Sequence, residues 1–96
     1  MTKPLIITAG VQRRLADLLP EEKRQCAVAL LELCEAFGRP HVHSGLGVRK
    51  LLPGVFECRA TISLRFVFRD TQDAEVVVFL RDLDEVQALI RSRRFP

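Results

Sequence analysis

Two short apolar segments in the second half of the chain carry arginines at spacings suited to phosphate chemistry. Side chains alternate between the two faces of a β-strand, so residues 55–60 and 64–69, paired as strands, would place Arg59 and Arg65 on one shared surface. A guanidinium is a planar fork of donors that binds a phosphate through two hydrogen bonds. The spacing therefore predicts an anion-binding surface at these two residues.

The opposite face of the same two strands is apolar and predicts the core that positions the arginines. Its members are Phe56, Cys58 and Ala60 in the first strand, and Leu64, Phe66 and Phe68 in the second. Packing of the neighbouring side chains would hold Arg65 outward, with its guanidinium exposed. A third segment, residues 75–80, is apolar at four successive positions from Val76 to Phe79. Such a strand is buried on both faces, which predicts that it lies inside the sheet.

Periodic apolar residues in the first half of the chain predict a pair of helices. After an apolar strand at residues 5–7, the helical spacing extends over residues 9–19, with Thr8 as the candidate N-cap. Pro20 then begins a second helix, because proline has no amide hydrogen to satisfy in a first turn, and Gly38 is its expected C-cap. The broad apolar face of the second helix must be covered by the sheet or by the first helix.

The remaining segments complete one α+β domain over residues 1–96. Residues 48–52 are extended and precede a proline–glycine turn, and Asp82 or Asp84 would cap a last helix with a narrow apolar stripe. The predicted order is one strand, two helices, a meander of strands and a terminal helix. It corresponds to a small, mainly antiparallel sheet with an N-terminal helical hairpin packed on one face and a short C-terminal helix.

The composition excludes several classes of protein. Of the 96 residues, 48% are hydrophobic and 28% are charged, which excludes a disordered or fibrous chain. The longest apolar run, residues 26–31, falls far short of the roughly 20 residues of a membrane span. The apolar residues 5–7 are too few for a signal peptide. We therefore expect a cytoplasmic protein with no membrane partner.

The cysteines and histidines predict no metal site and no other cofactor. Cys26, Cys34 and Cys58 are odd in number and each sits in an apolar pattern, so we expect buried, reduced thiols rather than disulfides. His41 and His43 lie in a glycine-rich loop after the second helix and lack a third ligand at a spacing typical of metal sites.

The basic excess of the chain is uneven. The formal net charge is +3, and Arg91, Arg93 and Arg94 crowd the last six residues. Two interpretations remain open at this point. The cluster contacts a polyanion or an acidic partner, or it is a solvated helix end whose charge complements the helix dipole.

The meander carries a recognisable pattern in the run GVFECRATISLRFVFR, with EVVVF behind it. This pattern resembles the RelE/ParE toxin superfamily of bacterial type II toxin–antitoxin systems, and the resemblance extends from about residue 5 to residue 90. Residues 56–59, FECR, stand where the RelE branch has an aromatic, basic, apolar, basic run. Residues 64–68, LRFVF, stand where that branch has the segment with a catalytic arginine.

The resemblance implies a ribosome-dependent messenger RNA endonuclease that a cognate antitoxin protein inhibits. Attack of a ribose 2′-hydroxyl on the phosphate needs a base, cations for the developing charge and an acid for the leaving oxygen. The implied catalytic residues are Arg65, Arg59 and Glu57, and the implied RNA contacts are Arg49, Lys50, Arg81 and His43. In this scheme the arginines supply the cations, and Glu57 or His43 is the base.

The chain also departs from the RelE pattern. Glu57 stands where RelE-like enzymes often have a lysine, Leu83 stands where relatives often place a histidine, and the chain has no tyrosine. These differences favour an alternative function as a gyrase-directed toxin of the ParE branch, or as a binding module of the same fold. A further alternative is that Arg59 and Arg65 are surface arginines paired with Glu57 and Asp70.

Overall fold

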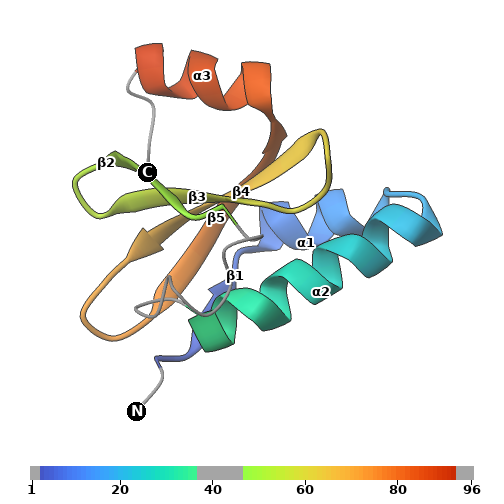
Figure 1. Ribbon diagram of the computed structural model, residues 1–96, viewed down its shortest axis with the longest axis horizontal. Helices are drawn as coiled ribbons and strands as arrows, with labels where there is room; N and C mark the ends of the chain where they lie inside the picture. The colour runs from blue at the N-terminus through green and yellow to red at the C-terminus, as the bar shows by residue number, and fades with distance from the viewer. Residues whose placement is uncertain (1–2, 37–46, 93–96) are drawn as a thin grey trace.

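The structure is a computed structural model that describes residues 3–36 and 47–92. Gly38, His41, His43, Arg93 and Arg94 lie outside these ranges. The order of elements is the predicted one (Figure 1) and confirms the α+β class. The elements are β1 (Leu5–Ile7), α1 (Ala9–Ala16), α2 (Pro20–Ala36), β2 (Arg49–Leu52), β3 (Val55–Arg59), β4 (Leu64–Asp70), β5 (Glu75–Asp82) and α3 (Leu83–Ser92).

The strands form a five-stranded sheet in the order β1-β5-β4-β3-β2. Neighbours from β2 to β5 are antiparallel, whereas β1 pairs with β5 in parallel, with Ile6 opposite Val76. β5 therefore lies inside the sheet, as its continuous apolar run predicted. Figure 1 shows α1 and α2 together on one side of the sheet and α3 on the other.

The side of the sheet covered by α1 and α2, here called the helical face, buries the larger core. Its buried members are Val11, Cys26, Ala29, Leu33, Cys58, Ala60, Leu64, Phe66, Phe68, Val77 and Leu80. Both predicted apolar sets of β3 and β4 lie in this core, with Phe56 packed against it and only partly buried. Burial of each large side chain contributes about 1.5–3 kcal/mol. This packing fixes the outward direction of the residues between them.

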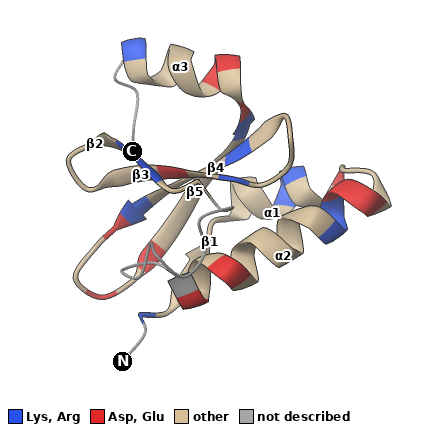
Figure 2. Ribbon diagram, in the orientation of Figure 1, with Lys and Arg blue, Asp and Glu red and all other residues tan. Residues whose placement is uncertain are grey.

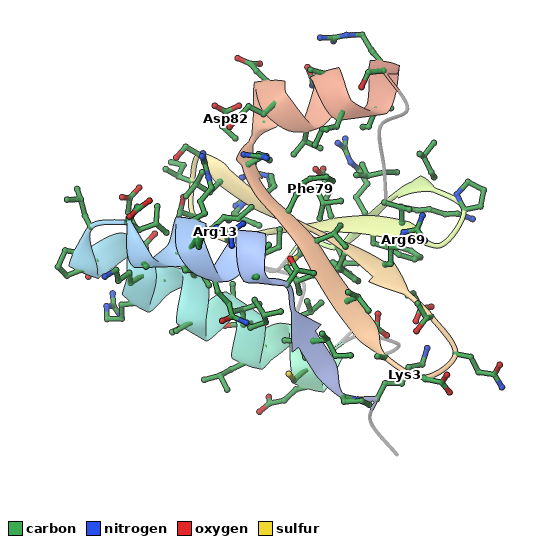
Figure 3. The ribbon with its side chains drawn as sticks, turned by 180° about the vertical axis from the view of Figure 1, so that it is seen from behind. Lys3, Arg13, Arg69, Phe79 and Asp82 are labelled. Carbon is green, nitrogen blue, oxygen red and sulfur yellow. The ribbon has the colours of Figure 1, made fainter. Side chains whose placement is uncertain are left out.

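The opposite side, here called the α3 face, has a smaller core. Val55, Val67 and Val86 are buried there, with Phe79 and Ile90 packed partly against them. Phe79 lies between β5 and α3 (Figure 3). Since a single short helix contributes to this core, the α3 face leaves room for charged side chains beside it.

An irregularity in β5 decides which of its residues lie on the α3 face. Val67 of β4 lies opposite Phe79, while the next residue of β4 lies opposite Val77, so Val78 has no partner in the register. A β-bulge adds one residue to a strand and reverses the alternation of side chains beyond it. Phe79 and Arg81 consequently lie on the α3 face, whereas strict alternation from Val77 would place both on the helical face.

The starts of the first and last helices differ in how they are capped. The Glu85 N–H donates to Asp82 Oδ1 at 2.8 Å, and the Asp82 N–H donates to Glu85 Oε1 at 3.1 Å, which is a capping box. This confirms Asp82 as the cap of α3. Thr8 stands at the N-cap of α1, but its side chain makes no capping hydrogen bond, which corrects the prediction. Its backbone N–H is bound instead to the Val77 carbonyl of β5.

The first helix is shorter than its apolar pattern predicted. α1 ends at Ala16 rather than at residue 19. The Leu18 N–H donates to the Leu15 carbonyl at 3.2 Å, which tightens the chain after the last helical turn. The Leu19 N–H then donates to Glu22 Oε1 at 3.3 Å, so the chain has already turned into α2.

Candidate nucleic-acid interface

Three arginines from three neighbouring strands form a row on the α3 face, here called the arginine row. Arg59 of β3 lies opposite Arg65 of β4, and Arg65 lies opposite Arg81 of β5. Directly opposed residues in such strands have their Cβ atoms about 4.5–5.5 Å apart. Figure 2 shows the basic segments of the three strands side by side below α3. The register confirms the predicted common surface of Arg59 and Arg65 and adds Arg81 to it.

Arg65, at the centre of the row, is tied to the turn between β3 and β4. Its Nη1 donates to the carbonyl oxygens of Leu64 at 3.0 Å, Thr61 at 3.1 Å and Ile62 at 3.4 Å. The expectation of a fully exposed guanidinium is therefore wrong, because the side chain folds back onto the turn. Within residues 3–36 and 47–92, no hydrogen bond reaches Nη2 or Nε of Arg65. Those donors are the ones that an anion would use.

The two ends of the row differ in how far their charge is compensated. The guanidinium carbon of Arg81 lies 5.5 Å from the ring centroid of Phe79, and Nη1 lies 4.0 Å from Glu85 Oε2. The Glu85 carboxylate also lies 3.3 Å from Arg14 Nη2, so two arginines share it. Arg59 is exposed and makes no ion pair with any described residue. The uncompensated positive charge is therefore greatest at Arg59.

Glu57 is buried beside the row, two residues before Arg59 on the same face of β3. Its exposed fraction is only 4%. Oε1 lies 2.6 Å from Arg49 Nη2, while Oε2 is buried and has no hydrogen-bond partner among the described residues. Glu57 is thus a buried carboxylate held by one arginine, with one oxygen left without a partner.

The carboxylates of Glu57 and Asp70, the possible partners of Arg59 and Arg65 in the sequence analysis, are not paired with the arginine row. Glu57 binds Arg49, and Asp70 binds Lys3, whose Nζ lies 2.5 Å from Asp70 Oδ1. The interpretation of the row as surface arginines neutralised by these two acids is therefore wrong.

Of the four predicted RNA contacts, Arg81 is the one that the structure brings into the row. Arg49 holds the buried glutamate, although its own side chain is 59% exposed. Lys50 lies opposite Phe56, whose ring packs against the core of the helical face. Because opposed residues share a face, Lys50 belongs to the helical side of β2. His43 lies outside the described residues.

Two of the three cysteines, Cys26 and Cys58, supply no nucleophile at neutral pH. All three are free. Burial raises the pKa of Cys58 to about 12 and that of Cys26 to about 11, so both remain thiols. Cys34 is exposed on α2, which corrects the prediction that all three cysteines are buried. Its neighbour Leu33 is fully buried, whereas Cys34 lies on the exposed side of α2 together with Leu31.

The described residues contain neither a metal-binding cluster nor a membrane-spanning helix. No group of three or more His, Cys, Asp or Glu residues there is arranged to hold a metal ion. No helix in those ranges is both long enough and apolar enough to cross a membrane.

A groove of about 480 Å³ runs beside Arg59, between α2 and the turn that joins β3 to β4. Sequence patterns did not indicate it, because its two walls come from segments that are about 30 residues apart in the chain. One signal was present: Ile62 is a large apolar residue in an otherwise polar turn. Its side chain is 91% exposed.

The fold of the chain has a counterpart among solved structures. The chain is similar to a chain of the RelBE2 toxin–antitoxin complex from Mycobacterium tuberculosis, with 20% sequence identity and a TM-score of 0.53. The match covers 85% of this chain and 99% of that chain. No protein-family model and no curated protein matches the sequence. The similarity in structure, over most of both chains, shows that this protein has the fold of a RelE-like toxin.

Proposed function

We propose that this protein is the toxin of a type II toxin–antitoxin system, and that it acts in the cytoplasm as a ribosome-dependent messenger RNA endonuclease. One observation carries the proposal, namely the row formed by Arg59, Arg65 and Arg81. Like charges directly opposite one another on a sheet are destabilising. The row is therefore favourable when an anion lies over it, and the phosphates of RNA are such an anion.

The row matches the part of RNA cleavage that requires positive charge. When the 2′-hydroxyl attacks the neighbouring phosphate, negative charge accumulates on the phosphate oxygens in the transition state. Arg59 offers an uncompensated guanidinium, and Arg65 offers the edge of its guanidinium that does not bind the turn. Arg81 is braced by Phe79 and Glu85, so it is suited to holding an adjacent phosphate in position.

Glu57 is the proposed base, but because it is buried, the ribose can reach it only if the structure opens locally. Its Oε1 is bound to Arg49, so the free lone pairs are those of the unpartnered Oε2. A carboxylate that is short of hydrogen bonds in a buried site gains strongly from accepting one. We infer that Glu57 acts after a local opening of the α3 face lets the ribose reach Oε2. His43 remains the alternative base.

The proposed partner that silences the toxin is a cognate antitoxin. The RelBE2 neighbour is itself part of a toxin–antitoxin complex. This chain has a net charge of +3, and its arginine row is accessible at Arg59. An acidic, partly disordered antitoxin segment would cover such a surface and block access to RNA. Its association should weaken as salt concentration rises.

The test of the proposal is primer extension on message bound to translating ribosomes. The wild-type protein should cut the message, and Arg65→Ala should cut it at least roughly a hundredfold more slowly, as expected for a lost contact to transition-state charge. Arg69→Ala is the matched control, because Arg69 is an exposed arginine of the same strand outside the row. Cleavage by Arg65→Ala at the wild-type rate would contradict the proposal.

Thermal melts must accompany this assay, since Arg65 also supports the turn. Loss of its three bonds to carbonyl oxygens should cost about 1 kcal/mol of stability. If Arg65→Ala remains folded at the assay temperature and does not cleave, the loss of cleavage is not caused by unfolding. Arg65 then has a role in cleavage besides its support of the turn.

A second candidate is a non-nuclease toxin of the same fold, directed at gyrase, or a catalytically inactive binding module. The burial of Glu57 in an ion pair with Arg49 favours it. So does the absence of tyrosine from the chain. Growth arrest on expression without a partner, combined with no cleavage by the wild type in the ribosome assay, would favour the gyrase-directed toxin. Normal growth at high soluble yield would instead favour the binding module.

A further inference from the structure

The turn beside the groove is rigid, although it carries the most exposed large apolar side chain among the described residues. Thr61 Oγ1 accepts hydrogen bonds from the N–H groups of Ser63 at 3.3 Å and Leu64 at 3.1 Å. The Leu64 carbonyl accepts the Ala60 N–H at 2.9 Å. Together with the bonds from Arg65, these contacts hold Ile62 in solvent at 91% exposure. The side chain is therefore preorganised for contact with another molecule.

The groove has two apolar walls that face each other across it. Ile62 stands on the side of the turn, and Val28, 43% exposed, stands on the side of α2. Arg59 lines the same groove and is also the end of the arginine row. The groove is thus continuous with the phosphate-binding surface proposed above.

The charges of the groove nearly cancel, in contrast with the row. Arg24 is held by Glu21 through two hydrogen bonds, at 2.5 Å and 3.0 Å. The remaining charged groups of the lining are Glu32 and Arg59, which have opposite signs. An apolar, nearly neutral slot therefore adjoins a strongly positive row. A nucleotide has the same distribution of properties, with a flat neutral base attached to an anionic phosphate.

We propose that this groove binds one unstacked nucleobase of the RNA strand whose phosphates lie along the arginine row. The inference rests on the proposed function and adds to it a base-binding subsite. Ile62 and Val28 contact the two faces of the base, and Arg59 binds the phosphate next to it. The volume of about 480 Å³ lies within the range of roughly 300–1,000 Å³ typical of small-molecule sites, and a base fits within it.

Glu32 gives the subsite a preference among bases. An ionised carboxylate only accepts hydrogen bonds. It therefore accepts hydrogen bonds from the exocyclic amino groups of adenine, cytosine or guanine, whereas uracil offers it only the ring N3–H. Gln25 lies in the same lining and offers an amide to the base edge.

An acidic peptide segment is the other class of ligand that an apolar groove could take. The near-neutral lining gives such a segment no electrostatic advantage inside the groove. The continuity of the groove with the row through Arg59 favours RNA.

The test measures binding of short single-stranded RNA by fluorescence anisotropy. The RNA carries 2′-O-methyl groups, which prevent cleavage, and a series of oligonucleotides each contains one abasic position. Ile62→Ala should weaken binding roughly fivefold or more, because the apolar surface of Ile62 that the base covers is lost. One abasic position should weaken binding of the wild type by a similar factor and should have little further effect on Ile62→Ala.

Leu31→Ala is the matched control, because Leu31 is 67% exposed on α2 and does not line the groove. It should bind RNA as the wild type does. Ile62 is so exposed that its replacement does not endanger the fold. Glu32→Gln should reduce the discrimination between cytosine and uracil at the sensitive position.

The possible results distinguish a failure of the base-binding subsite from a failure of the proposed function. If Arg59→Ala weakens binding while Ile62→Ala and every abasic position leave it unchanged, the subsite is wrong. Phosphate binding by the arginine row is then still supported. If Ile62→Ala binds RNA normally but loses a protein partner, the groove is a protein-docking site and the inference is overturned. If the wild type binds no RNA in this assay, the subsite is wrong, and the ribosome assay alone decides the proposed function.

Discussion

The helical face and the α3 face are built from the same strands, yet they contain different kinds of residue. On the helical face, Phe66 and Phe68 are wholly buried under α1 and α2. On the α3 face, a smaller core lies beside three arginines set next to one another. Because stability is concentrated on one face, the other can hold mutually repelling charges without loss of the fold. We infer that the two faces divide stability and function between them.

Each face also buries one glutamate, and the two are compensated differently. On the α3 face, Glu57 has Arg49 at 2.6 Å. Glu75 lies opposite Asp70 in β4, and the nearest cation, Lys3, is 3.8 Å away and is also bound to Asp70. Figure 3 shows Lys3 beside the turn between β4 and β5. Burial and the hydrogen bond with Asp70 raise the pKa of Glu75 to about 7.

The largest expected effect on stability comes from the helical face. Phe66 has no exposed surface, and Phe66→Ala removes its ring from the centre of the core. We expect a loss of about 3–5 kcal/mol in the free energy of unfolding, measured by urea denaturation. Arg69→Ala on the other side of the same strand should change this free energy by less than about 0.5 kcal/mol. Similar losses for the two variants would contradict the division between the faces.

A smaller effect is expected from the ion pair of the α3 face. Arg49→Ala leaves the Glu57 carboxylate buried without its cation, which should lower the free energy of unfolding by about 2 kcal/mol. The exposure of Arg49 to water limits the loss. Adding Glu57→Gln should restore most of it, because the buried charge is then absent. A double variant no more stable than Arg49→Ala would show that Arg49 acts through packing instead.

The smallest expected effect is a pH dependence that originates at Glu75. Its pKa is about 7 in the folded protein and near 4.5 in the unfolded chain. Between these values the folded state binds a proton that the unfolded state has released, so stability should fall as pH rises from about 4.5 to 7 and then level off. Glu75→Gln should flatten this decline, by about 1–2 kcal/mol between pH 5 and 8.

Asp73→Asn is the control for this prediction, because Asp73 is an exposed acid in the same turn between β4 and β5. The comparison uses urea denaturation at several pH values. Since Lys3 and Asp70 titrate outside the window, they do not obscure the difference. An unchanged pH profile in Glu75→Gln would mean that another group causes the dependence.

Local patterns predicted most of the fold because its elements obey simple periodicities. Alternation along β3 and β4 correctly separated the buried phenylalanines from Arg59 and Arg65. The continuous apolar run of β5 correctly indicated an interior strand. What alternation could not reveal was the bulge at Val78, since four successive apolar residues carry no information about which one is unpaired. That bulge places Arg81 in the row.

The candidate site was only partly predictable, because its remaining features depend on side-chain contacts between distant segments. Alternation along β3 correctly placed Glu57 on the same face as Arg59, but the pairing of Glu57 with Arg49 depends on the register of β2 against β3. The bonds from Arg65 to the turn depend on where the carbonyl oxygens point. Ile62 alone signalled the groove, and its opposite wall comes from α2.

The most direct test of the division between the two faces measures message cleavage and thermal unfolding on the same two variants, Arg59→Ala and Val77→Ala. Arg59 is exposed, whereas Val77 is fully buried in the core of the helical face. We predict that Arg59→Ala loses at least roughly a hundredfold in cleavage on ribosomes while its melting temperature stays near that of the wild type. Val77→Ala should lose about 1–3 kcal/mol of stability and cleave normally below its melting temperature. Wild-type cleavage by Arg59→Ala, in a protein that melts as the wild type does, would contradict the account.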